Sequence, residues 1–304
     1  MSKKHLVASG CSFTISDGEK IGTNNRSWAY GLRDSLPEDS LNLHNVGISG
    51  GGNVTISMNC INCVENLLKD NIKAEEIVVF IQWSGLFRPT LYAEKNGSRK
   101  IDFEEPTSPY FSLNKINQDR GYFIDTAGQF TGGNKFWNNY FQNYFSLPSA
   151  FNETLNSILK TQWYLKSKNI KYKMFTGWDI FTGRVNISEE SCAYDDASIN
   201  MLVADLMLNT HQFHSDIYEN KNHVFIKDIY PYFIDLWDMV DWENFWTFEN
   251  EKVKCGGILQ WVQNNKSFDD WYVNYGHDFH IPSHSNKSFA EEIIKPLYEK
   301  LIQS

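Results

Sequence analysis

Residues 5–14 read HLVASGCSFT, and this stretch indicates how the fold begins. The short apolar run that starts at His5 has the length of a strand, and small residues follow it where that strand would end. A serine on a tight turn at this point, Ser12, would hold its hydroxyl at the open edge of a sheet. Such a hydroxyl becomes a nucleophile when a base takes its proton, whereas a turn or N-cap serine has no chemical role.

Patterns of strands and helices alternate along the chain, which predicts a three-layer α/β/α sandwich with a mostly parallel, five-stranded sheet. The continuous run EIVVFIQW at 76–83 is typical of a strand that is buried on both faces. Pro296 should kink or limit the last helix, because proline has no N–H to donate. The expected strands cover 5–10, 41–47, 76–83, 170–177 and 222–229, and the expected helices cover 27–36, 53–70, 148–169 and about 285–302.

Three irregular, aromatic-rich segments interrupt this alternation, at about 89–148, 178–221 and 230–276. We expect them to be insertions in a single domain that spans 1–304, with a small hairpin around RGYFIDTAGQF in the first of them. Aromatic residues make up 15% of the chain, including 10 Trp. Core filling is one use of such rings, and a platform for the flat faces of sugars is another.

Charge and cysteine content narrow the classes of partner. The chain has 37 acidic and 28 basic residues, a net charge of -9, and the basic residues are scattered, which disfavours a nucleic-acid surface. Its apolar runs are too short for a membrane span or a signal peptide, so we expect cytoplasmic synthesis without a membrane partner.

The 5 cysteines form no disulfide framework, and we interpret Cys60 and Cys63, inside an expected helix, as core residues. The final location and the oligomeric state stay open.

Two distant segments are expected to meet Ser12 at the carboxyl ends of the strands, where parallel sheets bind ligands. The first is NVGISGGGN at 45–53, whose glycines allow close approach of the backbone and whose helix N–H groups can stabilise an oxyanion. It could also bind phosphate, but it lacks the lysine of a phosphate loop and the spacing of a dinucleotide fingerprint. The second is HDFHIPSHSNKSFAEEI at 277–293, where Asp278 is close to His280. An imidazole oriented by a carboxylate is the base that activates a serine.

Two alternatives compete with this serine chemistry. His277, His280 and His284 raise the question of a zinc site, but no Cys or carboxylate set completes a tetrahedral site at a recognisable spacing. We therefore expect neither a metal nor another cofactor. Cys11 is the competing nucleophile, but neighbouring side chains at a strand end point apart, and we interpret Cys11 as a small packing residue beside Ser12.

Taken together, the motifs resemble the SGNH hydrolase superfamily, also called GDSL-type esterases and lipases. SGCSFT at 9–14 resembles the first block of the family, with Cys11 in place of its usual Asp. NVGISGGGN resembles the second block, whose glycine matches Gly50, and DFHIPSHSNKSFAEEI resembles the last block, with its histidine at His280. RSWAYGLRDSL at 26–36 resembles the Trp-containing first helix. The matching segments span both ends of the chain, in the order of the family.

The resemblance implies the flavodoxin-like SGNH hydrolase fold and hydrolysis of an acyl ester through an acyl-enzyme. Ser12 would be the nucleophile and His280 the general base, and the main-chain N–H groups of Ser12 and Gly50 would form part of the oxyanion hole. Substrates in the superfamily are lipids, thioesters and acetylated sugars, and the aromatic segments favour an O-acetyl ester on a carbohydrate as the small-molecule or glycan partner. A sugar O-acyltransferase and a catalytically weak glycan-binding or structural module are the alternatives.

The third family block supplies an Asn side chain as a further oxyanion donor, and Ser84 stands at that position here. Losing one such donor costs about 3 kcal/mol in the transition state, which Gln82 or Arg88 would have to offset. We assign Trp83 and Arg88, at the end of the same expected strand, to substrate binding.

The acidic partner of the base also departs from the family pattern. The family acid lies three residues before the histidine, a position held here by His277, whereas Asp278 lies two before His280. Either Asp278 orients the imidazole, or Ser12 and His280 act as a dyad with a main-chain carbonyl as the third group.

Overall fold

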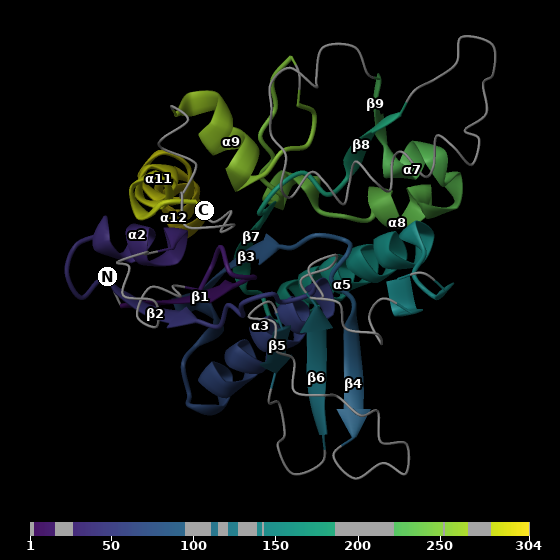
Figure 1. Ribbon diagram of the computed structural model, residues 1–304. Helices are drawn as coiled ribbons and strands as arrows, with labels where there is room; N and C mark the ends of the chain where they lie inside the picture. The colour runs from purple at the N-terminus through teal and green to yellow at the C-terminus, as the bar shows by residue number, and fades with distance from the viewer. Residues whose placement is uncertain are drawn as a thin grey trace.

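A parallel sheet forms the centre of the protein (Figure 1). The structure is a computed structural model that describes residues 3–15, 27–94, 111–114, 121–126, 139–141, 143–185, 222–251, 253–266 and 281–303. Within these residues the sheet has four strands in the order β2-β1-β3-β7, all parallel. They are β1 (Lys4–Ser9), β2 (Leu41–Asn45), β3 (Ile77–Trp83) and β7 (Lys171–Thr176).

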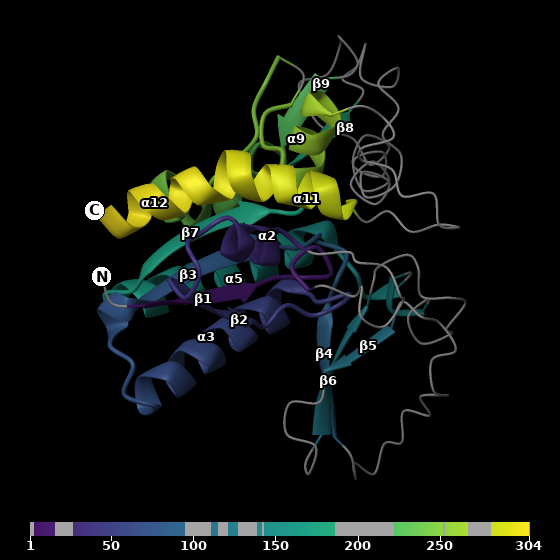
Figure 2. The same cartoon turned by 90° about the vertical axis from the view of Figure 1, so that its left-hand side faces the viewer.

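The middle strand β3 explains why this sheet is parallel and covered on both faces. All seven of its residues are buried, so a strand of this composition needs helices above and below it. The helices α2 (Trp28–Asp34), α11 (Ser283–Phe289) and α12 (Lys295–Gln303) cover one face, and α3 (Asn53–Lys69) and α5 (Leu147–Ser167) cover the other (Figure 2). The predicted α/β sandwich with a mostly parallel sheet is therefore confirmed.

The sequence predicts that Pro296 kinks or limits the last helix, but the helix does not end there and instead changes form just before it. A π-helical turn, η6 (Ala290–Ile294), joins α11 to α12, and the Lys295 N–H donates to the Ala290 carbonyl. Proline can donate no helical hydrogen bond and its ring collides with the preceding turn. The wider π turn gives the ring room, so the helix continues to Gln303.

The fifth strand of the predicted sheet is a correction. We expected it at 222–229, but β9 (Asn222–Phe225) pairs antiparallel with β8 (Thr182–Val185) in a separate sheet, and α7 (Ile226–Ile229) follows. The open edge of β7 is met instead by a single parallel bridge between Met174 and Phe245. An apolar run predicts a strand but does not specify its partner, which explains the error.

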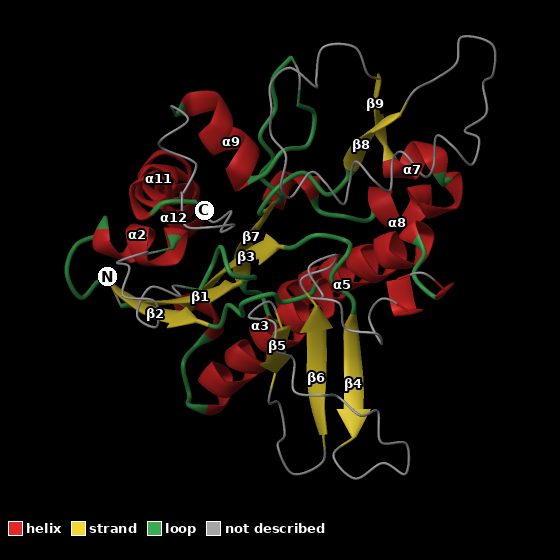
Figure 3. Ribbon diagram, in the orientation of Figure 1, coloured by secondary structure: helices red, strands yellow, loops and turns green. Residues whose placement is uncertain are grey.

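A small antiparallel sheet follows β3 in the chain (Figure 3). Its strand order is β4-β6-β5, with β4 (Thr90–Glu94), β5 (Phe111–Asn114) and β6 (Gly121–Thr126). The sequence predicted a hairpin in this region. In the structure β6 pairs antiparallel with both β4 and β5, which precede it in the sequence. The remaining short helices are η1 (Ala74–Glu76), η4 (Pro231–Phe233), α8 (Ile234–Asp238), η5 (Trp242–Asn244) and α9 (Ile258–Asn265).

Several aromatic residues of the third insertion, Trp237 and Phe245 among them, pack into a core. Phe181 is fully buried, and the rings of Trp237, Trp242 and Phe245 contact it edge-on at centroid distances of 5.2, 5.7 and 5.7 Å. Such edge-to-face packing stabilises a core beyond the area that it buries. These rings therefore take the core-filling role and do not form a sugar platform. Among the described residues, no helix is long and apolar enough to cross a membrane.

Candidate functional site

Ser12 lies in a tight turn directly after β1. The Cys11 carbonyl accepts hydrogen bonds from the Thr14 N–H at 2.9 Å and from the Ile15 N–H at 3.2 Å, which closes the turn. The Ser12 side chain is 8% exposed. Its hydroxyl lies 4.0 Å from Cys11 Sγ, a weak acceptor, and makes no shorter hydrogen bond to any residue that the structure describes. The turn holds Ser12 at the carboxyl end of β1 and leaves its hydroxyl weakly bonded.

Gln82, the next-to-last residue of β3, ties this turn to the sheet. Its Oε1 accepts hydrogen bonds from the Cys11 N–H at 3.2 Å and the Thr14 hydroxyl at 3.1 Å. The indole N–H of Trp28, from α2, donates to the same Thr14 oxygen at 3.1 Å. Because Gln82 Nε2 already donates to the Trp83 carbonyl at 2.6 Å, the geometry argues against Gln82 as a substitute oxyanion donor.

Glycine at position 10 is required for this arrangement. A Cβ on Gly10 would collide with Thr14 Oγ1 and would lie 2.8 Å from Gln82 Oε1. The small residue in SGCS therefore has a packing reason, since any side chain there would open the hydrogen bonds that position the turn. Cys11 is fully buried beside the same glutamine, with Sγ 3.3 Å from Gln82 Oε1, which confirms its predicted packing role.

The glycine-rich loop after β2 lies alongside the Ser12 turn. Pairing with β1 continues past the end of β2, because the Val46 N–H donates to the Ala8 carbonyl and the Ile48 N–H to the Gly10 carbonyl, both at 2.9 Å. Gly50 follows with a φ of 72°, in the left-handed region that favours glycine. The loop therefore leaves the sheet at the carboxyl ends of β1 and β2, where the sequence analysis expects it.

Asn45 makes a second connection between the loop and the turn. Its Nδ2 donates to the Thr14 carbonyl at 2.7 Å, and its Oδ1 accepts from the Gly47 N–H at 3.1 Å. Within the described part of the chain, the main-chain N–H groups of Ser12 and Gly50 have no hydrogen-bond acceptor. An oxyanion hole requires N–H groups that are not already engaged, and these two meet that condition within the described residues.

Asn53, the first residue of α3, is a site residue that the sequence analysis missed. Its Oδ1 accepts from the Ser84 N–H at 2.8 Å, and its Nδ2 donates to the Ser84 carbonyl at 3.0 Å and to Thr154 Oγ1 at 2.9 Å. Asn53 thus holds the main chain at the end of β3. An asparagine placed directly after a glycine run, at a helix start, is the one signal that the sequence offered for it.

Ser84, predicted as the third oxyanion donor, is fully buried. Its hydroxyl has no hydrogen-bond partner among the residues described. Thr176 Oγ1 is buried without a partner in the same way, and Thr176 pairs in register with Trp83, the neighbour of Ser84. Two buried hydroxyls without partners therefore lie at the carboxyl ends of two adjacent strands.

Trp83 and Arg88, both predicted to bind substrate, lie in different surroundings. The Trp83 side chain is fully buried, and its indole N–H is directed to Met174 Sδ at 3.4 Å, which argues against a contact with substrate. The Arg88 guanidinium stacks over the Trp178 ring, with Cζ 5.0 Å from the ring centroid. Trp178 also contacts Phe13 at a centroid distance of 5.5 Å, so it connects Arg88 to the residue beside the serine.

The predicted base and its acidic partner, His280 and Asp278, lie outside the described residues, as does His277. The description resumes at Ile281, whose carbonyl accepts a hydrogen bond from Asn286 Nδ2 at 3.0 Å at the start of α11. Among the described residues, no group of three or more His, Cys, Asp or Glu side chains is placed to hold a metal ion.

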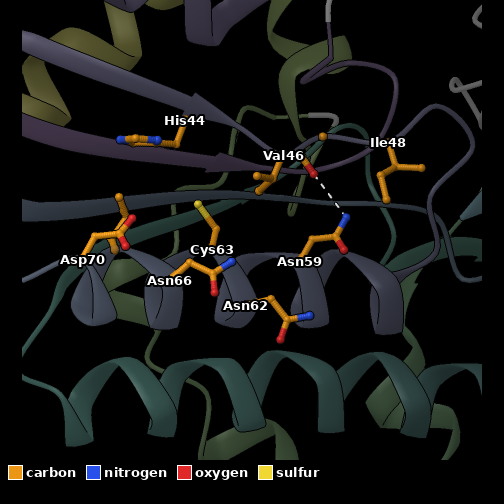
Figure 4. Close-up of a pocket in the computed structure, with 10 residues that line it drawn as sticks. His44, Val46, Ile48, Asn59, Asn62, Cys63, Asn66 and Asp70 are labelled. Atoms are coloured by element: carbon orange, nitrogen blue, oxygen red, sulfur yellow. Dashed lines mark hydrogen bonds between the residues drawn. The ribbon is translucent and has the colours of Figure 1, made fainter. Parts of the chain in front are cut away.

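An open groove of about 540 Å³ lies between β2 and α3, next to the glycine-rich loop (Figure 4). Gly47 and Ile48 of the loop line one end, and the carboxamide of Asn59 donates to the Val46 carbonyl at 3.3 Å. Asn62, Cys63, Asn66, Leu67, Asp70 and His44 complete the lining. No motif in the sequence predicted this groove.

Two titratable groups of the groove have shifted pKa values. Burial and the neighbouring His5 lower the pKa of His44, whose ring stacks on His5 at 5.2 Å with Nε2 3.0 Å from His5 Nδ1. Burial raises the pKa of Cys63 to about 11, so its thiol is protonated at neutral pH. Cys60, one turn earlier, is fully buried in the core, as predicted.

No family model matches this chain, and no curated protein matches it. Among the solved structures it is similar to the crystal structure of protein YxiM from Bacillus subtilis, with 9% sequence identity and a TM-score of 0.46. The similarity covers 99% of this chain and 57% of that chain, so this chain spans little more than half the length of that protein. A likeness of this size assigns neither a family nor an activity.

Proposed function

We propose that this chain is a serine-dependent ester hydrolase with Ser12 as its nucleophile. The observation that carries the proposal is the contact between the Ser12 turn and the glycine-rich loop at the carboxyl ends of β1 and β2. Asn45 joins the two segments through its hydrogen bonds to Thr14 and Gly47. A weakly bonded hydroxyl thus lies in the same structural unit as main-chain N–H groups that have no acceptor in the described part of the chain.

The proposed reaction has two steps. His280 takes the proton of Ser12 Oγ as the oxygen attacks the acyl carbonyl, and then gives that proton to the departing alcohol. In the second step His280 takes a proton from the water that attacks the acyl-enzyme and returns it to Ser12 Oγ as the Ser12–acyl bond breaks, which releases the acid. In both steps the N–H groups of Ser12 and Gly50 stabilise the negative charge on the carbonyl oxygen. The partner of His280, either Asp278 or a main-chain carbonyl, stays a prediction.

The position of Ser84 leads us to expect slow turnover. Its hydroxyl is closed off from solvent and is shorter than the Asn side chain for which it would substitute. An oxyanion hole with two donors in place of three loses about 3 kcal/mol of transition-state stabilisation, which is roughly a hundredfold in rate. We propose an acetyl ester of a carbohydrate as the substrate, because a small acyl group suits a nucleophile that is 8% exposed.

The test compares the wild-type protein with Ser12→Ala on p-nitrophenyl acetate. We expect the substitution to reduce kcat/KM to the uncatalysed background, and to leave the urea midpoint unchanged because the hydroxyl makes only a weak contact. Activity of the wild type should rise with pH through about 6.5, as a histidine base loses its proton. A fluorophosphonate probe, followed by mass spectrometry, should label the peptide that contains Ser12.

Two outcomes contradict the proposal. Equal rates for the wild type and Ser12→Ala would remove Ser12 as the nucleophile. Labelling of Cys11 in place of Ser12 would move the chemistry to the neighbouring thiol.

A second function, glycan binding without turnover, is favoured by one observation. The closed position of Ser84 leaves the proposed oxyanion hole without a third side-chain donor. A binding module of this kind would retain a glycan-array signal after Ser12→Ala and would hydrolyse no ester. Transfer of the acyl group to a sugar acceptor shares the acyl-enzyme step with hydrolysis, and added acceptor would then increase the release of p-nitrophenol.

A further inference from the structure

Arg88 is a partly buried cation that has no anionic partner among the residues that the structure describes. Its Nη1 is buried and has no hydrogen-bond acceptor in the described structure. No carboxylate that the structure describes lies within ion-pair distance of Arg88, whereas Arg33 on α2 pairs with Asp34 at 2.8 Å.

The ring of Trp178 contacts the Arg88 guanidinium. Trp178 stacks beneath it at 5.0 Å, and Trp178 is 3% exposed. Gly85, three residues before Arg88, allows this contact, because a Cβ there would lie 2.8 Å from Trp178 Cζ2. An aromatic ring beneath a guanidinium orients its plane and leaves its N–H groups available at the edge.

The position of Arg88 relates it to the proposed nucleophile. Arg88 follows β3, and Trp178 follows β7, so both lie at the carboxyl ends of the strands, on the side where Ser12 follows β1. These ends lie towards the right of the sheet in Figure 2. Phe13, the neighbour of Ser12, contacts the same Trp178 ring at 5.5 Å.

Two hydroxyls at the ends of the same strands also lack partners among the described residues, but they are closed off from solvent. Ser84 Oγ and Thr176 Oγ1 belong to fully buried residues, whereas Arg88 is only partly buried. A buried polar atom without a partner costs about 1 to 3 kcal/mol, and a charged one costs more. Of the three residues, Arg88 is the one that a ligand can reach.

We propose that Arg88 binds an anionic group of the substrate, a carboxylate or a phosphate, so that the ester is carried by an acidic carbohydrate. A planar guanidinium recognises both groups by two parallel hydrogen bonds. The ester part of this inference rests on the proposed function. The anion site is inferred independently, from the geometry of Arg88 and Trp178.

The experiment measures binding by calorimetry on the full chain with Ser12→Ala, so that no turnover interferes. The probes are glucuronate and glucose 6-phosphate, with glucose as the neutral reference. We expect at least one acidic probe to bind about tenfold more tightly than glucose or better. Whichever probe shows this preference identifies the carboxylate or the phosphate as the recognised group.

Variants then assign the preference to Arg88. Arg88→Gln should abolish it, and Arg88→Lys should retain only part of it, because an ammonium has the charge without the planar fork. Arg33→Gln is the matched control, since Arg33 is an exposed arginine on α2 with its own partner, and it should leave binding unchanged.

Equal binding of glucose and both acidic probes would overturn the proposal, as would an acidic preference that persists in folded Arg88→Gln. If Arg88→Gln does not fold, the comparison of glucose with the two acidic probes on the protein that retains Arg88 decides between the outcomes. Failure of the ester-hydrolase proposal is distinguishable, because it appears as absent Ser12-dependent hydrolysis of p-nitrophenyl acetate while the binding results stand by themselves. A kinetic measurement on the protein with an intact Ser12 compares an ester that carries a carboxylate, 4-acetoxybenzoate, with a neutral ester, phenyl acetate. Arg88→Gln should lower kcat/KM for 4-acetoxybenzoate about tenfold relative to phenyl acetate.

Discussion

The Ser12 turn and the ends of β3 and β7 lie at the same edge of the sheet, but their buried hydroxyls are bonded differently. Thr14, in the turn, donates to Gln82 and accepts from Trp28, both at 3.1 Å. Thr176, at the end of β7, is equally buried and has no partner within the described residues. Bonded hydroxyls fix a main-chain geometry, whereas a buried hydroxyl without a partner contributes no such bond. We therefore expect the hydroxyl of Thr14 to stabilise the fold and that of Thr176 to contribute nothing to it.

The largest effect is expected for Gln82→Leu. The substitution leaves the Cys11 N–H and the Thr14 hydroxyl without their acceptor, whereas the Trp83 carbonyl still accepts from the Gly177 N–H at 3.0 Å. We expect the free energy of unfolding in urea to fall by about 3 to 5 kcal/mol, because each buried group left unpaired costs roughly 1 to 3 kcal/mol. Loss of the fluorophosphonate label should accompany it if the protein still folds.

Gln162→Leu is the control for this prediction. Gln162 is a buried glutamine of α5 whose side chain makes two hydrogen bonds, to the Met239 carbonyl and from the Asp241 N–H, both at 2.8 Å. We expect a cost of about 2 to 4 kcal/mol, with labelling of Ser12 retained. A smaller cost for Gln82→Leu than for this control would show that Gln82 does not hold the turn.

The direct test of the difference between the two regions replaces Thr14 and Thr176, one at a time, by valine, which has nearly the same shape as threonine. Thr14→Val should lower the free energy of unfolding by about 2 kcal/mol, because Trp28 Nε1 and Gln82 Oε1 each lose a partner. Thr176→Val should be neutral or stabilise the protein by about 1 kcal/mol, since it removes a buried hydroxyl that has no bond to lose. Equal costs in urea unfolding would refute the distinction between the two regions.

A smaller effect, dependent on pH, is expected far from both regions, at Asp241. Burial raises its pKa, but hydrogen bonds from Lys166, Tyr172 and Asn244 outweigh this and lower the pKa to about 2. Since the folded pKa lies below the unfolded value near ~3.9, the stabilisation is present above about pH 4 and is lost as the pH falls towards 2.

Asp241→Asn should therefore reduce the loss of stability between pH 6 and pH 2 by about 1 kcal/mol, a value that allows for solvent screening. Urea unfolding at several pH values measures this difference. An unchanged pH profile in the variant would mean that other carboxylates account for the acid sensitivity.

The sequence predicted the elements whose signals are local. The strand β3 was identified from an unbroken β-branched run, and the change of form in the last helix from Pro296. Both signals act through the backbone or through side chains a few residues away, so they need no knowledge of the rest of the fold. The meeting of the Ser12 turn and the glycine-rich loop also followed, because adjacent parallel strands end at one edge.

Tertiary structure alone decided which partners those elements took. Pairing of β9 with β8 in place of the central sheet, the burial of Trp83, and the hold of Asn53 on Ser84 all join residues far apart in the chain. The burial of a side chain and its hydrogen-bond partners depend on what packs against it, which the neighbouring residues in the sequence do not specify. The stretch HLVASGCSFT therefore predicted a strand followed by a turn, but only the folded sheet determined that the turn is held by Gln82.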